Sequence, residues 1–253
     1  MPDIRTLADQ LWRGEIDTTV HHPVTAFTCA GEEIADGVLF FKKVQRFPGE
    51  WATALRAMAA LDADLLVPGH GIPIFGADRI RAALTDTAVL LETIEGRVLA
   101  LMNAGATLDR VLHEVRPPER LLAKPYLRPV YDDPQFIVRN VWRLYGGWYD
   151  GEPDNLLPAP RAEQAREWVA LAGGLERVLE RAAALLAEGN ARLACHLIEF
   201  AVLTDPDSPD VHRLRREIYQ ARSRAQVSSM ARNILNHAAL ASAEGKRDLA
   251  GPA

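Results

Sequence analysis

The sequence predicts a mainly α-helical protein whose N-terminal part has too few strands to complete a sheet. Apolar residues recur every three or four positions from residue 76 onward, as in helices that bury one face. Only two or three candidate strands precede residue 75, fewer than a stable sheet needs. We therefore expect an incomplete α/β part over residues 1–75, an all-helical domain over 76–243 and a disordered tail over 244–253.

Short elements follow one another in the N-terminal part. Residues 3–14 have the apolar spacing of a helix that Gly14 ends, and residues 37–41 predict a strand. The apolar run 65–67 predicts another strand, which leads into a loop around His70. Between these strands, a helix is expected to begin near Pro48. Its apolar face comprises Trp51, Leu55, Met58 and Leu61.

The helical part begins with one long apolar stripe. Residues 116–136 predict an ordered connector, and the next helix is expected to run through Tyr145 and to break at the following two glycines. Three or four antiparallel helices are expected over 162–226, of which 182–219 has the spacing of a tetratricopeptide-like hairpin. The stripe comprises Ile80, Leu84, Ala88, Leu91, Ile94, Val98, Leu99 and Met102.

Composition excludes several classes of function. A net charge of -5 without a dense basic run argues against a nucleic-acid partner. Cys29 and Cys195 are far apart, so neither a disulfide framework nor a zinc ribbon is indicated. No apolar run is long enough for a membrane span. A soluble, cytoplasmic protein is expected, and the Gly-x-Ser-x-Gly, phosphate-loop and dinucleotide motifs are absent.

Four segments, in order, resemble the alkylsulfatase-like branch of the metallo-β-lactamase superfamily across roughly residues 44–240. They are "PGHGIPIFGADRIRAAL", "LALMNAGATLDRVLHEV", "PYLRPVYDDPQFIVRNVWRLYGGWYDGEPDNL" and "ALAGGLERVLERAAALLAEGN". The resemblance implies a metallo-hydrolase domain that binds two zinc ions and cleaves a sulfate or related ester. It also implies a following helical domain that forms the homodimer and closes over the active site.

By this resemblance, His70 matches the late histidine ligand of the metallo-hydrolase domain. The main signature, His-x-His-x-Asp-His, is absent, and the sequence passes at 41/42 from a first-strand segment to one just upstream of the late histidine. We therefore expect an internal deletion there, and little or no bound zinc, because a catalytic zinc normally takes three protein ligands. The alternative for His70 is a loop histidine bonded to protein or solvent; nearby Asp64 and Asp78 are as well explained by a strand start and a helix start.

The resemblance also implies substrate contacts in the helical domain. Arg139 could pair with a sulfate anion, beside Trp148, Tyr149 and Asp150. Alternatively, the two aromatic side chains bury a helix corner while Arg139 and Asp150 form a local ion pair. The expected function is that of a non-catalytic, homodimerising family member. The alternatives are a zinc-dependent hydrolase of alkyl sulfate or related esters, and a tetratricopeptide-like adaptor.

Overall fold

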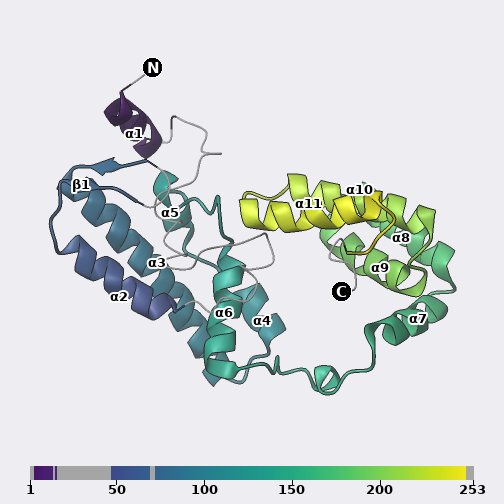
Figure 1. The fold of residues 1–253 in the computed structure, drawn as a ribbon. Helices are drawn as coiled ribbons and strands as arrows, with labels where there is room; N and C mark the ends of the chain where they lie inside the picture. Colours follow the sequence, from purple (N-terminus) through teal and green to yellow (C-terminus); the bar gives the residue numbers. More distant parts are fainter. Residues whose placement is uncertain (1–2, 14, 16–46, 69–71, 249–253) are drawn as a thin grey trace. The chain divides into compact units, whose positions relative to one another are not determined.

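The computed structural model describes residues 3–13, 15, 47–68 and 72–248 (Figure 1). They divide into two compact units, with the boundary between Pro153 and Asp154. In this described part, eleven α-helices and one two-stranded sheet confirm the mainly helical fold class. The strand predicted over 37–41, the site of the expected deletion and His70 lie outside the described residues.

The long helix α3 (Ala77–Asn103) is the central helix of the first unit. It packs along α2 (Pro48–Ala59) and against α6 (Pro134–Gly146) (Figure 1). The predicted stripe is buried along most of α3, and each fully buried leucine or valine contributes about 1.5–3 kcal/mol relative to exposure. The residues of α3 that are almost fully buried are Ile80, Ala83, Leu84, Ala88, Leu91, Ile94 and Val98.

The structure confirms the apolar face predicted for α2 except at its last residue, Leu61. Leu55 is buried, and Trp51 and Met58 pack against the core as half-buried residues. Leu61 is 76% exposed because α2 ends at Ala59, so the helical spacing no longer places residue 61 on the buried face. The helix begins at a proline, as predicted, since a first-turn proline gives up no helical hydrogen bond.

A short hairpin and the first helix lie at one end of α3 (Figure 1). The strands β1 (Leu65–Leu66) and β2 (Ile74–Phe75) pair antiparallel, with Leu65 opposite Phe75. The helix α1 (Ile4–Trp12) is anchored by its last residue, because the Trp12 ring stacks on Tyr126 with centroids 4.5 Å apart. Strand β1 therefore confirms the strand predicted before the His70 loop, although it is shorter than expected.

The predicted connector is ordered and contains short helical turns. After α4 (Leu108–Glu114) come α5 (Glu119–Leu122) and the 3-10 turn η2 (Pro125–Leu127). Tyr126 is buried, and its hydroxyl donates a hydrogen bond to Asp86 at 2.6 Å. This connector therefore packs on α3 and contributes to the core.

The second unit, as far as residue 248, contains five helices. After the turn η3 (Pro153–Asn155) they are α7 (Arg161–Leu171), α8 (Leu175–Ala187), α9 (Ala191–Thr204), α10 (Pro209–Arg224) and α11 (Ser229–Ala243). The helix α9 is central: α7, α8 and α10 all pack against it, and α11 packs on α10. The three or four helices expected over 162–226 are observed as four, α7 to α10. None of the described helices combines the length and apolar character that crossing a bilayer requires.

Polar side chains fix where these helices begin. Asn190, Ser208 and Ser228 each accept a hydrogen bond from a backbone N–H in the first turn that follows. Such caps satisfy N–H groups that have no partner inside the helix. The predicted breaks at residues 189–190 and 205–209 are therefore capped turns.

Candidate functional sites: the corner after α6 and the outer face of α7

The chain turns sharply after α6, and hydrogen bonds hold the turn in place. Gly147 adopts φ +75° directly after the helix, as the predicted glycine break requires. The buried Trp142 side chain donates from Nε1 to the Tyr149 carbonyl at 3.0 Å. The Leu108 N–H donates to the Asp150 carbonyl at 2.7 Å, which ties the corner to the start of α4.

Close backbone approach explains the glycine that ends this corner. Gly151 has φ +91°, and a Cβ built on it would lie 3.1 Å from Thr107 Cα. The Asp150 carboxylate accepts a hydrogen bond from the Glu152 N–H at 2.9 Å. The corner is therefore a fixed platform for the side chains of residues 148 and 149.

The aromatic side chains of this platform face solvent. Trp148 is 82% exposed and Tyr149 is 38% exposed, and their rings meet edge to face with centroids 5.9 Å apart. The expectation that Trp148 buries the corner is wrong, because Trp142 fills that place. Arg139 is exposed on α6.

The described residues do not supply a zinc site. Nowhere in the ranges that the structure describes do three or more His, Cys, Asp or Glu side chains gather as metal ligands. Asp78 pairs with Arg81 at 2.8 Å in the first turn of α3, and the Asp64 carbonyl accepts from the Gly76 N–H at 2.9 Å. A zinc ion does not fit this part of the chain, and the predicted ligand His70 lies outside it.

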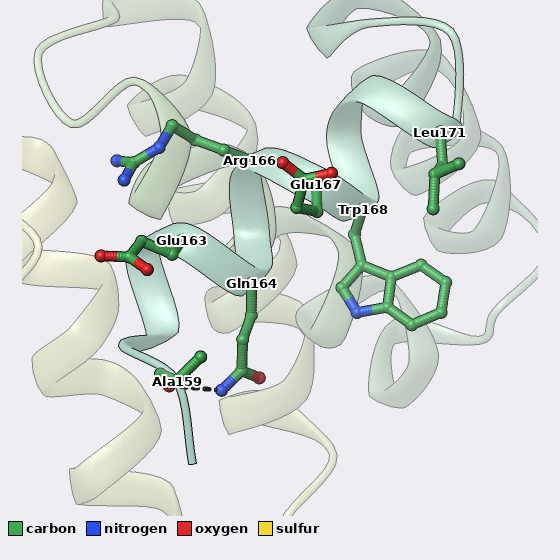
Figure 2. A pocket seen from close by; sticks show the side chains of 7 residues that line it. All are labelled: Ala159, Glu163, Gln164, Arg166, Glu167, Trp168 and Leu171. Carbon is green, nitrogen blue, oxygen red and sulfur yellow. Dashed lines mark hydrogen bonds between the residues drawn. The ribbon is translucent and has the colours of Figure 1, made fainter. Parts of the chain in front are cut away.

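The helix α7 has apolar side chains on two sides. Ala165 and Val169 are buried, with Val169 in the core of the second unit. Trp168 and Leu171 are instead 59% and 78% exposed. Figure 2 shows both side chains at the same end of α7, away from Glu163. The inner face of the Trp168 ring stacks on Phe200 of α9, with centroids 6.5 Å apart, so the indole is held in place at the surface.

The second unit has one hollow along α7 and another along α8. The first, of about 560 Å³, runs along α7 beside Trp168 and Leu171 (Figure 2), and the Gln164 side chain donates to the Ala159 carbonyl there at 2.6 Å. The second has a volume of about 550 Å³. The second hollow is lined by Ala172, Arg177, Val178, Glu180, Arg181, Ala184 and Leu197.

The exposure of Trp168 and Leu171 was not predicted from the sequence. A signal was present, because the apolar positions of α7 span more of the helix circumference than Ala165 and Val169 alone would need. A wide apolar arc on a short helix indicates a second contact face, and sequence alone does not say which side packs internally.

A family model described as alkyl sulfatase dimerisation matches residues 107–245, which are 139 of the 253 residues. The match runs from the residue that caps α4 to just beyond α11, so it includes the corner and both hollows. A linear primary-alkylsulfatase from Pseudomonas sp. is 34% identical over 190 residues, covering 75% of this chain and 35% of that protein. An alkyl/aryl-sulfatase from Saccharomyces cerevisiae is 27% identical over 198 residues, covering 78% and 29%.

Solved structures show the same relationship. The stereoselective inverting sec-alkylsulfatase Pisa1 from Pseudomonas sp. superposes with a TM-score of 0.75 at 30% identity. That superposition covers 79% of this chain and 32% of the other. The chain spans about a third of the length of these relatives. From the extent of the matched model and the shared helical fold, the chain belongs to the alkyl sulfatase dimerisation family.

Proposed function

We propose that this chain is a homodimerising family member that does not hydrolyse sulfate esters by itself. The observation that supports self-association most strongly is the exposure of Trp168 and Leu171, at 59% and 78%, within the matched domain. Large apolar side chains gathered at a surface are typical of interaction sites. A second copy is the partner that a dimerisation domain favours.

The proposal that catalysis is lost depends on the supply of metal ligands. A two-zinc centre needs several ligands converging on adjacent ions, and the sequence contains no His-x-His pair. His70 alone is too few, and the described ranges offer no other ligand cluster.

A second candidate is zinc-dependent hydrolysis of alkyl sulfate or related esters. It is favoured by the exposure of Trp148, whose 82% exposed indole could cover an alkyl chain, with Arg139 available for the sulfate group. In this alternative Tyr149 and Asp150 would complete the substrate contacts and His70 would be one of the metal ligands.

Metal content and turnover, measured on the same preparations, separate the two candidates. The full chain and His70→Ala would be purified in zinc-supplemented buffer, assayed for zinc and incubated with octyl sulfate while released sulfate is followed. The proposal predicts much less than one zinc per chain, the same in both proteins, and no release above buffer. Near two zinc ions per chain, lost in His70→Ala together with sulfate release, would establish the hydrolase instead.

A further inference from the structure

We infer that an exposed side of the helix pair α10–α11 binds an acidic segment of another protein. This inference goes beyond the proposed self-association, because the partner is a different chain. We call this side the α10–α11 surface, and Figure 1 shows the two helices side by side. The surface consists of Arg216, Gln220 and Arg224 on α10 and of Arg232 and Asn236 on α11.

Helical spacing brings these side chains together. Arg216, Gln220 and Arg224 recur at every fourth position, so they lie along one face of α10. The Cα atoms of the two arginines on this face are about 12 Å apart. The two residues on α11 are also four positions apart. Because the Ser223 hydroxyl donates to the Arg232 carbonyl at 3.0 Å, the start of α11 lies beside the end of α10 that carries Arg224.

The three arginines of this surface are exposed and have no carboxylate beside them. None of Arg216, Arg224 and Arg232 forms an ion pair with another residue in the ranges that the structure describes. The Arg224 guanidinium donates to the Gln220 side-chain oxygen at 3.5 Å, a long contact between neutral and charged groups. The exposed Arg181, in contrast, pairs with Glu188 at 2.7 Å. The surface therefore retains guanidinium groups that can bind carboxylates in the bidentate geometry.

The positive charge is a local property of this part of the chain. No Asp or Glu lies between Glu217 and Glu244, and the same stretch contains Arg222, Arg224 and Arg232. The whole chain has a net charge of -5. A long polyanion such as a nucleic acid would be repelled by the rest of the molecule, whereas a short acidic segment meets only the positive surface. The charge distribution therefore favours an acidic polypeptide.

The residue types of the surface favour the same partner. Gln220 and Asn236 place side-chain amides beside the arginines, and both amide and guanidinium N–H groups donate to carboxylate oxygens. None of the five residues is aromatic, so the surface offers no platform on which nucleobases stack. None is a large apolar residue that would enter the boundary of a bilayer. These residues suit an acidic peptide better than a nucleic acid or a lipid surface.

Binding of a model acidic peptide to the full chain tests the inference. A short fluorescein-labelled glutamate homopeptide would be titrated and followed by fluorescence anisotropy, with a glutamine homopeptide as the neutral probe. The double variant Arg224→Gln with Arg232→Gln removes two of the three charges and keeps side chains that suit a helix. The dissociation constant of the glutamate peptide should rise at least about tenfold in this variant. The glutamine peptide should not bind.

A second double variant separates specific binding from general electrostatics. Arg161→Gln with Arg192→Gln makes the same change in net charge at two exposed arginines on α7 and α9, which also form no ion pair within the described ranges. This control should change the dissociation constant by less than about twofold. Circular dichroism on both variants shows that the fold is retained. Equal weakening in the two double variants would overturn the α10–α11 surface as the binding site.

The other anionic partners are tested in the same titration. Failure of the wild-type chain to bind the glutamate peptide overturns the inference. So does tighter binding of oligothymidylate or of phosphatidylserine vesicles at the same salt concentration. If Arg224→Gln with Arg232→Gln instead weakens self-association, the occupant is a second copy and the inference of a different chain fails. A wild-type chain that is dimeric without binding the peptide would leave the proposed function standing, so the two failures are distinguishable.

Discussion

The Arg215 guanidinium donates a hydrogen bond to the Glu199 carboxylate at 2.7 Å inside the second unit, where these side chains are only 4% and 14% exposed. The same guanidinium donates to the Ala238 carbonyl at 3.0 Å and to the Ser242 hydroxyl at 2.7 Å. The Tyr219 hydroxyl donates a second hydrogen bond to the Glu199 carboxylate, at 2.9 Å. These contacts link α9, α10 and α11. They are important for holding α11, because none of its residues is in the described apolar core cluster of the second unit.

Removing the cation of this pair should destabilise the second unit strongly. Arg215→Ala leaves the Glu199 carboxylate buried without its main partner, and such changes cost about 3–5 kcal/mol. Arg213→Ala is the matched control, because Arg213 pairs with Asp210 at 2.8 Å with both side chains about two-thirds exposed. That control should cost less than about 1 kcal/mol. Urea unfolding followed by circular dichroism gives both values, and equal losses would contradict a structural role for the buried pair.

The same pair makes stability depend on acid pH. Burial alone would raise the pKa of the Glu199 carboxyl, but the Arg215 guanidinium and the Tyr219 hydroxyl outweigh burial and lower that pKa below its ordinary value. The stabilisation is present above the unfolded-state pKa of about 4.3 and is lost as the pH falls through the lower folded-state pKa. Melting temperatures below pH 5 should therefore fall more steeply for the wild type than for Glu199→Gln. Parallel curves would contradict this prediction.

The corner after α6 should tolerate a side chain at one glycine better than at another. Gly147→Ala and Gly151→Ala both place alanine at a positive φ, which costs about 1 kcal/mol. Only at Gly151 does the new Cβ also crowd Thr107, at 3.1 Å, whereas Gly147 faces open space. Gly151→Ala should therefore lose about 1–3 kcal/mol more than Gly147→Ala in urea unfolding. Indistinguishable losses would mean that the corner relaxes away from α4.

The thiol of Cys195 should be inert in the folded protein. It is buried, and burial raises its pKa, which Arg222 only partly offsets. The Cys29→Ser variant leaves Cys195 as the single thiol of the chain. Because the thiolate is the reactive form, Cys195 in this variant should react with a maleimide at least about a hundredfold more slowly in buffer than in urea. Folded protein that is labelled as fast as unfolded protein would show that α9 opens readily.

The helices were predictable because their signals are local. The stripe from Ile80 to Val98 and the glycine break after Tyr145 each depend on residues close in the chain, and the structure confirms both. Leu61 was wrongly predicted to lie on the buried face of α2, because the sequence has no strong stop signal at Ala59, where the helix ends. Boundaries set by weak signals are therefore the part of the fold that propensity predicts least well.

The candidate site was predicted only in part because it depends on contacts between distant segments. The sequence located Trp148 and Tyr149 at a fixed corner, but not that Trp142 fills the corner and leaves Trp148 exposed. Charges such as Arg215 and Glu199 are usually solvated on helices, so their burial follows only from the packing of α11. The exposure of Trp168 likewise depends on which side of α7 meets α9.

The central claim is that the chain self-associates as a closed dimer, and sedimentation equilibrium of the wild-type protein tests it most directly. Measured over about a hundredfold range of concentration, the mass should approach twice the chain mass of 27.9 kDa and stay there. A mass of 27.9 kDa at every concentration, or a mass that keeps rising beyond the dimer, would contradict the account.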